Sequence, residues 1–176
     1  MSSAGRESAS KETGVDSGHP SSFVVRRARE RDVATIVHLW QELQQANTGY
    51  DKRLATKPSA PSWYESFIRL QLEHENASVL VAEVDGVVAG YVFGQVMQRP
   101  TLSEGDCGYV ADLCVDPSHR GNGIGRRLFY EIRSWFVRAG INHLEVQVVR
   151  GNPASQAFWR KMGFDEFLRT LRSDIK

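Results

Sequence analysis

The chain has 176 residues, of which 41% are hydrophobic and 24% charged, as expected for one soluble globular domain with a core of its own. The 22 Lys and Arg nearly balance the 21 Asp and Glu, so no overall charge indicates nucleic acid or an anionic membrane as a partner. No apolar run approaches the roughly 20 residues that a membrane helix needs.

The N-terminal segment differs in composition from the rest of the chain. Residues Met1 to Ser22 are rich in Ser, Gly, Glu and Lys, and we expect a disordered tail before a single domain over residues 23–176. No secretory pattern is present. Cys107 and Cys114 fall in one predicted strand, about 23 Å apart if it is extended, which is too far for a disulfide. These features predict a reduced, cytoplasmic protein.

From residue 23 onward the apolar residues recur with strand and helix periods. The chain should begin with a strand at 23–28 and a helix through Val33 and Leu43, followed by a long loop at 47–61 that contains Gly49 and two prolines. A helix from Ser62 comes next. Two strands, 78–84 and 87–97, are joined by Asp85-Gly86, a strong hairpin signal.

The C-terminal half alternates in the same way. The expected elements are a strand at 107–115, a helix at 123–139, a strand at 143–149, a helix at 152–162 and a final strand at 164–171. Such alternation predicts an α/β fold with a mixed sheet, because hairpins precede the crossover helix.

The segment from Asp112 to Leu128 is an apolar strand, a Pro turn, three glycines at alternate positions and a helix. Glycines at 121, 123 and 125 permit φ > 0 and add no Cβ, so backbone N–H groups can converge on an anion at the positive end of the helix. A flexible loop with solvated arginines is the alternative. A dinucleotide fingerprint would need glycine where Arg126 stands, and the Gly-Lys-Ser/Thr of a P-loop is absent.

Two motifs resemble those of a known family. Arg120-Gly-Asn-Gly-Ile-Gly125 is similar to the Arg/Gln-x-x-Gly-x-Gly/Ala signature of the GNAT superfamily of N-acetyltransferases, and Asn152 to Phe164 resembles its second motif, Asn-x-x-Ala-x-x-Phe/Leu-Tyr-x-x-x-Gly-Phe. The resemblance covers about residues 110–164. It implies a GNAT fold, with a mixed sheet of about six or seven strands that splays between the fourth and fifth, and about four helices on its faces.

The resemblance also implies acetyl-CoA as cosubstrate, with no metal. The pantetheine arm would follow the fourth strand and the pyrophosphate would bind amides of the glycine turn. The contact residues implied are Leu113, Cys114, Val115, Arg120, Gly121, Asn122, Gly123, Ile124, Gly125, Arg126, Asn152, Ser155 and Trp159. Asn152 precedes a proline, so a helix cap alone is its alternative role. Trp159 stands where many members have tyrosine, and an indole cannot act as the acid that protonates the thiolate.

Acetyl transfer to an amine needs a base, because a primary amine with a pKa near 10.4 is mostly protonated at pH 7. Asp112 is the candidate base, since burial in its apolar strand can raise its pKa toward the working range; Glu145 is the weaker candidate. For Asp112, pairing with an arginine or exposure at the strand edge is the alternative. Tyr50, Asp51 and Arg53, in the predicted loop, are candidates for binding the acceptor.

The sequence therefore predicts an N-acetyltransferase that passes the acetyl group of acetyl-CoA directly to an amine in a ternary complex. A CoA-binding sensor of the same fold without turnover is the alternative, because of Trp159. The expected partner is a small-molecule or peptide amine, with no nucleic acid and no membrane, and an exposed final strand leaves a homodimer open. Polyamine, aminoglycoside, amino acid, protein N-terminus and lysine all remain open as acceptor.

Overall fold

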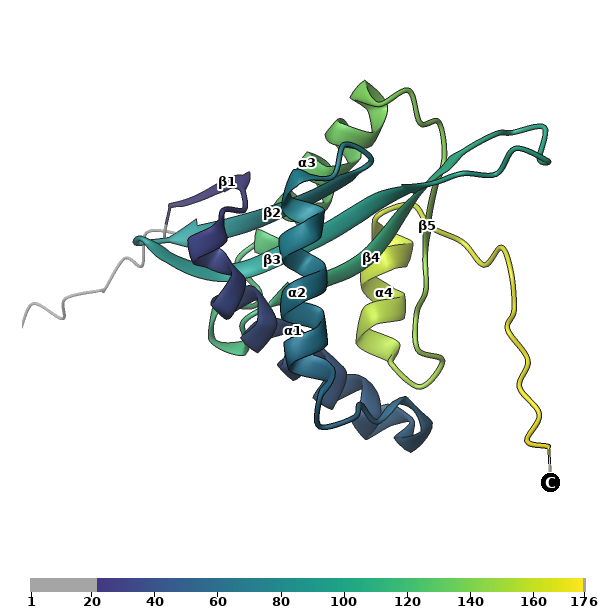
Figure 1. Ribbon diagram of the computed structural model, residues 1–176, viewed down its shortest axis with the longest axis horizontal. Helices are drawn as coiled ribbons and strands as arrows, with labels where there is room; N and C mark the ends of the chain where they lie inside the picture. The colour runs from purple at the N-terminus through teal and green to yellow at the C-terminus, as the bar shows by residue number, and fades with distance from the viewer. Residues whose placement is uncertain (1–21, 176) are drawn as a thin grey trace, which may run out of the picture.

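The computed structural model describes residues 22–175, which form a five-stranded mixed sheet with helices on both faces (Figure 1). Of the predicted disordered tail only Ser22 lies within the described residues. The strands, in the spatial order of the sheet, are β1 (Phe23–Arg27), β2 (Ala77–Val84), β3 (Val87–Met97), β4 (Cys107–Val115) and β5 (Leu144–Val146). The α-helices are α1 (Val33–Tyr50), α2 (Ala60–Glu73), α3 (Ile124–Arg138) and α4 (Pro153–Lys161), and 3₁₀ turns are η1 (Glu30–Asp32), η2 (Lys52–Leu54) and η3 (Pro117–His119).

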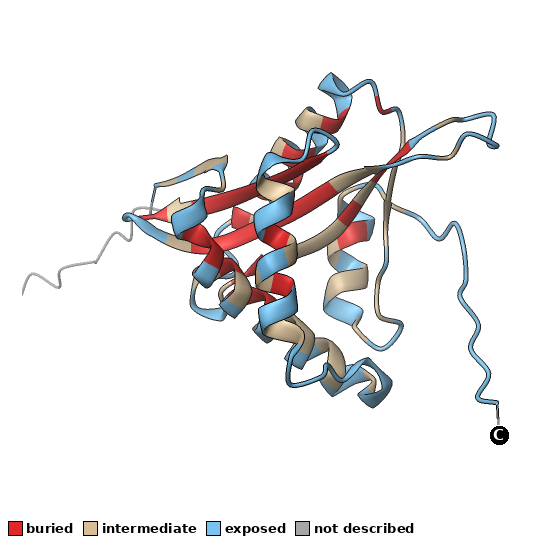
Figure 2. Cartoon of the chain, in the orientation of Figure 1, coloured by how far each residue is buried: buried red, intermediate tan, exposed pale blue. Residues whose placement is uncertain are grey.

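Side chains of the central strands alternate between two buried faces. In β3, Tyr91 and Phe93 pack in the cluster under α1 and α2, whereas Val92 packs in the cluster that contains α3 residues and Trp159 of α4. Figure 2 shows this burial running through the middle of the sheet. Because both faces are covered, β2 and β3 read as nearly continuous apolar runs in the sequence. The predicted α/β class with a mixed sheet is confirmed.

A bulge in β4 decides which way its polar residue points. Phe93 pairs with Asp112 and Gly94 pairs with Val110, which leaves Ala111 as an extra residue. Val110 and Asp112 would share a face in a regular strand. Here Val110 packs on the α3 side, while Asp112 bonds to a residue of α2 on the other side. The bulge therefore turns Asp112 toward α1 and α2.

The sheet opens between β4 and β5. All other neighbouring strands are antiparallel, but β5 runs parallel to β4 and pairs only through Gly108–Leu144, Tyr109–Glu145 and Val110–Val146. From residue 111 to 115 β4 continues alone on that side. Its main-chain groups at this edge are therefore not covered by β5, in agreement with the splay expected between these strands.

The bounds predicted for several elements are confirmed, and the predictions for two segments, 47–61 and 164–171, are wrong. The Asp85-Gly86 hairpin is confirmed, with both residues at positive φ, and β3 and β4 have the predicted bounds. Much of the predicted loop at 47–61 is helical instead, because α1 continues to Tyr50, η2 follows, and α2 begins at Ala60. The predicted final strand at 164–171 is absent from the described chain. Residues 164–171 pair with no strand, not even with the free edge of β5, so the sheet of the described residues has five strands instead of six or seven.

Two expectations about the whole chain can be compared with the structure. Cys107 and Cys114 do not pair, as predicted, and both are buried. Among residues 22–175, no helix combines the length and the apolar character required to span a membrane.

Candidate active site

The glycine turn leads into an uncapped helix. Gly121 and Gly123 have φ of 84° and 82°, which other residues adopt only with strain. Gly123 is the N-cap of α3, and no side chain caps it. The first intrahelical bond shown there is from Arg127 N–H to the Gly123 carbonyl, at 3.0 Å. The amides of Ile124, Gly125 and Arg126 are therefore free to bind an anion at the positive end of the helix.

The turn is fixed to the end of β4 by Arg120. Its Nε donates to the Val115 carbonyl at 2.8 Å, so the guanidinium holds the turn against the strand. Arg126 and Asn122 are exposed beside the free amides. Leu113 and Val115 point their side chains into the α3 side of the core. Their main chain lies on the part of β4 that β5 leaves uncovered.

The two predicted contacts at the start of α4 form a helix cap. The Asn152 side chain accepts a hydrogen bond from the Ser155 N–H at 2.9 Å, and Pro153 is the first helical residue. The cap role, which was the alternative for Asn152, is therefore present in the structure. A contact of either residue with a cosubstrate stays a prediction.

Trp159 belongs to an aromatic cluster. It is 7% exposed and packs edge-to-face on Phe129, Phe158 and Phe164, with ring centroids 5.7, 5.0 and 5.1 Å away. The indole thus contributes to the joint between α3, α4 and the segment after α4. This arrangement explains why a large aromatic residue without an acidic proton fits here.

Asp112 is the carboxylate that the structure surrounds with apolar residues and tyrosines. Burial raises the pKa of the Asp112 carboxyl to about 6, and a hydrogen bond from Tyr64 opposes that rise. The Tyr64 hydroxyl donates to Oδ2 at 2.8 Å and lies 3.3 Å from the hydroxyl of Tyr91. Burial, followed by the nearby Asp112 charge, also raises the pKa of both tyrosines well above their usual range. No arginine pairs with Asp112 among the described residues, so the predicted alternative of an ion pair does not apply.

Glu145, the weaker candidate base, is held by an arginine. Arg99 Nη1 and Nη2 donate to its two carboxylate oxygens at 2.6 and 2.7 Å. The pair is partly exposed, with 22% of the Arg99 side chain and 20% of Glu145 accessible. Both carboxylate oxygens thus accept hydrogen bonds from a cation, whereas Asp112 accepts one from a tyrosine, at Oδ2.

The three candidate acceptor residues lie at the end of α1 and in η2. Tyr50 lies beside Gly151, where a Cβ would come within 3.4 Å of Tyr50 Cβ. This contact brings the end of α1 next to the turn before α4. Arg53 and Asp51 bond to each other instead, at 2.6 Å between Nη2 and Oδ2, and this bond lowers the pKa of Asp51 to about 2. A hollow of about 470 Å³ between α1 and residues 55–61 is lined by none of these three.

Sequence reasoning missed Tyr64, Tyr91 and Glu42. Tyr64 and Tyr91 occupy apolar patterns of α2 and β3, and nothing in those patterns indicates that the hydroxyls meet at Asp112. Glu42 of α1 has a buried carboxylate oxygen, Oε2, without a hydrogen-bond partner. Its charge helps to raise the pKa of Cys114, although burial is the main cause. A charged residue on the otherwise apolar face of α1 was the available signal for Glu42.

An open edge of β4, a free N-terminus of α3 and a half-buried carboxylate thus lie along one strand and the turn that follows it. Comparison with known proteins identifies the family. Residues 36–164 match the model of the Acetyltransferase (GNAT) family, and the chain belongs to that family. The family resemblance stated from the two motifs is thereby confirmed.

Two curated relatives and one solved structure illustrate the similarity. An uncharacterised N-acetyltransferase of Methanocaldococcus jannaschii is 23% identical over 82% of this chain, and N-alpha-acetyltransferase RimI of Mycobacterium tuberculosis is 31% identical over 58%. The chain spans 61% of the length of each. A predicted acetyltransferase of Clostridium acetobutylicum, solved with acetyl-CoA, is 15% identical and has a TM-score of 0.72, covering 87% of this chain and 96% of its own. At that identity the likeness shows the fold alone.

Proposed function

We propose that the protein transfers the acetyl group of acetyl-CoA directly to an amine, with both substrates bound at once and Asp112 as the general base. The observation that carries this proposal is the position of Asp112. It lies where β4 parts from β5, on the strand that leads to the free amides of α3, and its carboxyl has a pKa of about 6. A carboxylate with that pKa is mostly ionised at pH 7 and can accept a proton.

The chain fits acetyl-CoA on the grounds of its own geometry. The amides of the turn from Gly121 to Arg126 would bind the pyrophosphate, since positive φ at Gly121 and Gly123 turns the backbone toward the ligand without a Cβ. The exposed edge of β4 would bind the pantetheine amides. Bound there, acetyl-CoA supplies an activated thioester carbonyl, which backbone N–H groups of β4 can polarise.

Two features support direct transfer without an acyl-enzyme. Cys114 follows Asp112 by two residues in β4 and carries a thiol, but burial, foremost, raises the pKa of this thiol to about 12, so it stays protonated. The departing CoA thiolate, with a pKa near the 8.5 of cysteine, needs little help to leave. We therefore nominate no general acid in place of the missing tyrosine.

The surroundings of Asp112 support a cationic amine as acceptor. Glu42 brings a second carboxylate to the α1 side of β4, and the charges of Glu42 and Asp112 both raise the pKa of Cys114, after burial as the main cause. Two carboxylates attract a protonated amine, and Asp112 can then deprotonate it. Tyr50, beside Gly151, would border the same site, with Asp51 and Arg53 behind it. If replacing Tyr50 leaves the KM of a confirmed acceptor unchanged, this part of the proposal is wrong.

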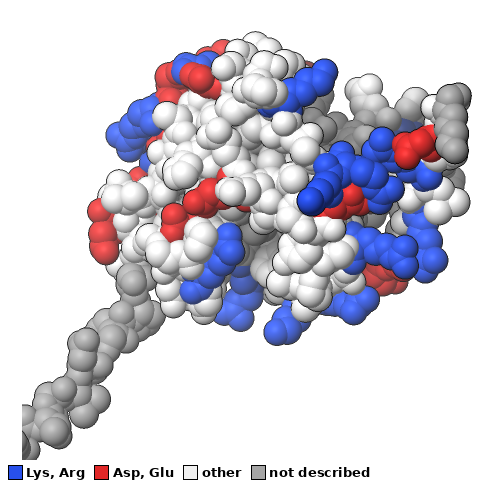
Figure 3. Space-filling view, turned by 90° about the horizontal axis from the view of Figure 1, so that it is seen from below, with Lys and Arg blue, Asp and Glu red and all other residues white. Residues whose placement is uncertain are grey.

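Charges of both signs occur together over the face shown in Figure 3, where Lys and Arg gather on one side with Asp and Glu among them. Such a mixture does not favour a polyanion, which binds to a field of one sign. The observation supports a small or peptide amine as acceptor.

The test is release of CoA thiol from acetyl-CoA with a panel of diamines, amino acids and N-terminal peptides, for the wild type, Asp112→Asn and Glu145→Gln. We expect turnover with at least one cationic amine. Asp112→Asn should lower kcat on the order of 10²–10⁴-fold while acetyl-CoA still binds. Glu145→Gln should retain most of the rate.

Two other results would decide against the proposal. Tight acetyl-CoA binding without turnover on any amine would favour the sensor alternative. Full activity of Asp112→Asn, with loss in Glu145→Gln, would exchange the roles of the two carboxylates.

A further inference from the structure

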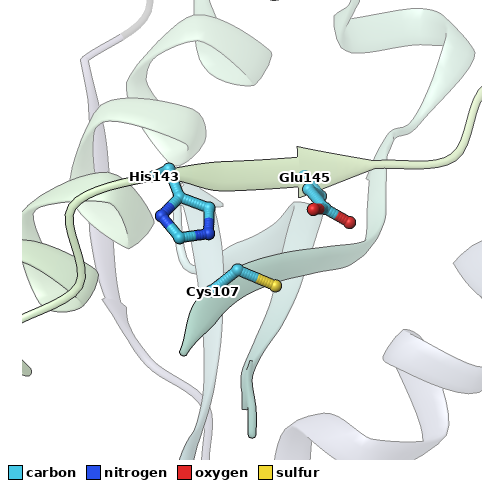
Figure 4. A group of neighbouring side chains, drawn as sticks. All are labelled: Cys107, His143 and Glu145. Atoms are coloured by element: carbon cyan, nitrogen blue, oxygen red, sulfur yellow. The ribbon is translucent and has the colours of Figure 1, made fainter. Parts of the chain in front are cut away.

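Three different metal-binding side chains meet at the end of the sheet where β4 begins. Ligand atoms of Cys107, His143 and Glu145 all lie within 4.8 Å of one another, and the three side chains point to the same side of the strands (Figure 4). His143 and Glu145 are two residues apart, but Cys107 belongs to another strand, so the sequence spacing did not indicate a metal site.

The backbone explains why they meet. His143 immediately precedes β5 and Glu145 is its second residue, so the two share one face of the strand, as residues two apart do. Cys107 is the first residue of β4, and the next residue, Gly108, pairs with Leu144 and donates its N–H to the His143 carbonyl at 3.0 Å. Neighbouring strands lie about 4.8 Å apart, so the thiol falls between the imidazole and the carboxylate.

The three groups are a ligand set that suits zinc. Thiolate sulfur, imidazole nitrogen and carboxylate oxygen are the donors that Zn²⁺ takes in tetrahedral sites, with water as a common fourth ligand. Zinc bonds of roughly 2.0–2.3 Å place neighbouring ligand atoms about 3.5 Å apart. Side-chain rotations that move each ligand atom by about an ångström would bring the three atoms from within 4.8 Å of one another to that spacing.

Arg99 does not block such a site. It occupies one acceptor position on each carboxylate oxygen of Glu145, and each oxygen has a second lone pair. Hydrogen bonds of this kind commonly orient a carboxylate that binds a metal. On binding, the S–H bond of Cys107 breaks, its proton leaves to solvent, and a sulfur–zinc bond forms.

We propose that Cys107, His143 and Glu145 bind one Zn²⁺ that clamps the start of β4 to β5. The physical reason for a clamp is the weakness of this strand pair. β5 is three residues long and pairs with β4 through three residue pairs before the two strands separate. A metal at their common end fixes the point from which the opening for the cosubstrate begins. This site is structural and does not depend on the proposed acetyl transfer.

The experiment uses the full chain, freed of metal with a chelator and then titrated with Co²⁺. One equivalent should produce a thiolate-to-cobalt charge-transfer band in the near ultraviolet together with intense visible bands of a tetrahedral site, and Zn²⁺ should remove both. Zn²⁺ should also raise the melting temperature. Cys107→Ser should abolish the charge-transfer band, and His143→Asn and Glu145→Gln should each weaken Zn²⁺ binding at least about tenfold.

Cys114→Ser is the matched control, because Cys114 is the other buried cysteine of β4 and has no histidine of the cluster beside it. It should bind Co²⁺ as the wild type does. Cys107 is fully buried, so its substitution could disturb folding, and a thermal melt of each metal-free variant shows whether it folds. His143 is partly exposed, so His143→Asn tests the site with less risk to the fold. Absence of the band in the wild type, its persistence in Cys107→Ser, or equal loss in Cys114→Ser would overturn the proposal.

Discussion

At the scale of single residues, the structure separates two carboxylates that resemble each other in sequence. Asp112 and Glu145 both lie on central strands, but Glu145 is bonded to Arg99 and Asp112 receives a hydrogen bond from a neutral tyrosine. The sequence predicted a buried carboxylate at 112 because of its apolar neighbours. It did not predict Tyr64, since a tyrosine on an apolar helix face usually fills the core.

Tyr64→Phe should move the pH dependence of the reaction. The Tyr64 hydrogen bond lowers the pKa of Asp112, so its loss lets burial raise that pKa above about 6. The acidic limb of kcat against pH should shift upward. Tyr91→Phe is the control, because its hydroxyl contacts Tyr64 but does not bond to the carboxylate. If the acidic limb of kcat against pH does not move in Tyr64→Phe, the group that titrates there is not Asp112.

Asp112→Asn should also stabilise the fold at high pH. The folded state raises the Asp112 pKa from 3.8 to about 6, so it binds the proton more tightly than the unfolded state, and ionisation costs about 3 kcal/mol in full. The protonated Asp112 therefore contributes its full stabilisation of the fold below about pH 4, and this stabilisation is lost as pH rises through about 6. Denaturant unfolding should find the variant more stable by about 1–3 kcal/mol at pH 8 and equal to the wild type near pH 4. If the variant and the wild type are equally stable at both pH 4 and pH 8, the pKa of Asp112 is not raised in the folded protein.

At the scale of elements, the turn before α3 was predictable and the segment after α4 was not. The turn depends on local chemistry, because glycine alone adopts positive φ freely, and the spacing of Gly121 and Gly123 is visible in the sequence. A strand depends on a distant partner. Residues 164–171 have strand-like composition, yet β5 ends at Val146 and the structure pairs them with nothing. The bulge at Ala111 is likewise invisible in an apolar run.

Gly123→Ala should weaken acetyl-CoA binding more than its cost to folding explains. Alanine at φ 82° is strained by roughly 1 kcal/mol, and its Cβ would lie 4.0 Å from Arg126 Nη2, beside the free amides. Gly140→Ala is a matched control, because Gly140 has φ 78° at the other end of α3 with nothing near a Cβ. Both variants should lose similar stability in denaturant titrations. Calorimetry should show at least about tenfold weaker acetyl-CoA binding for Gly123→Ala alone.

At the scale of the whole molecule, one sheet carries two separate cores. The cluster on the α3 and α4 side holds the glycine turn before α3 in place, and the cluster on the α1 and α2 side lies around Asp112. The α/β class and the order of elements followed from periodicity, because both cores are built from regular alternation. Which core faces Asp112 did not follow, since it depends on one unpaired residue in β4.

Leu128→Ala should destabilise the whole chain, because this α3 residue is fully buried in the first core. The expected loss is about 2–5 kcal/mol of unfolding free energy. Leu70→Ala, at a leucine of α2 that is 71% exposed, should change it by less than about 0.5 kcal/mol. Urea titration followed by circular dichroism measures both. A similar small effect in the two variants would mean that the α3 side does not pack as described.

The extra residue in β4 limits how this protein can change over evolution. If Ala111 joined the regular ladder and no residue were lost, Asp112 would take the face of Val110 and turn toward α3, away from Tyr64. The loop of residues 98–106 has no such constraint, because it precedes the strand and sets no phase. We expect natural relatives to vary in length before β4 and to keep the pairing that directs the carboxylate toward α2, while the residues around it diverge in α1, α2 and the turns that border them.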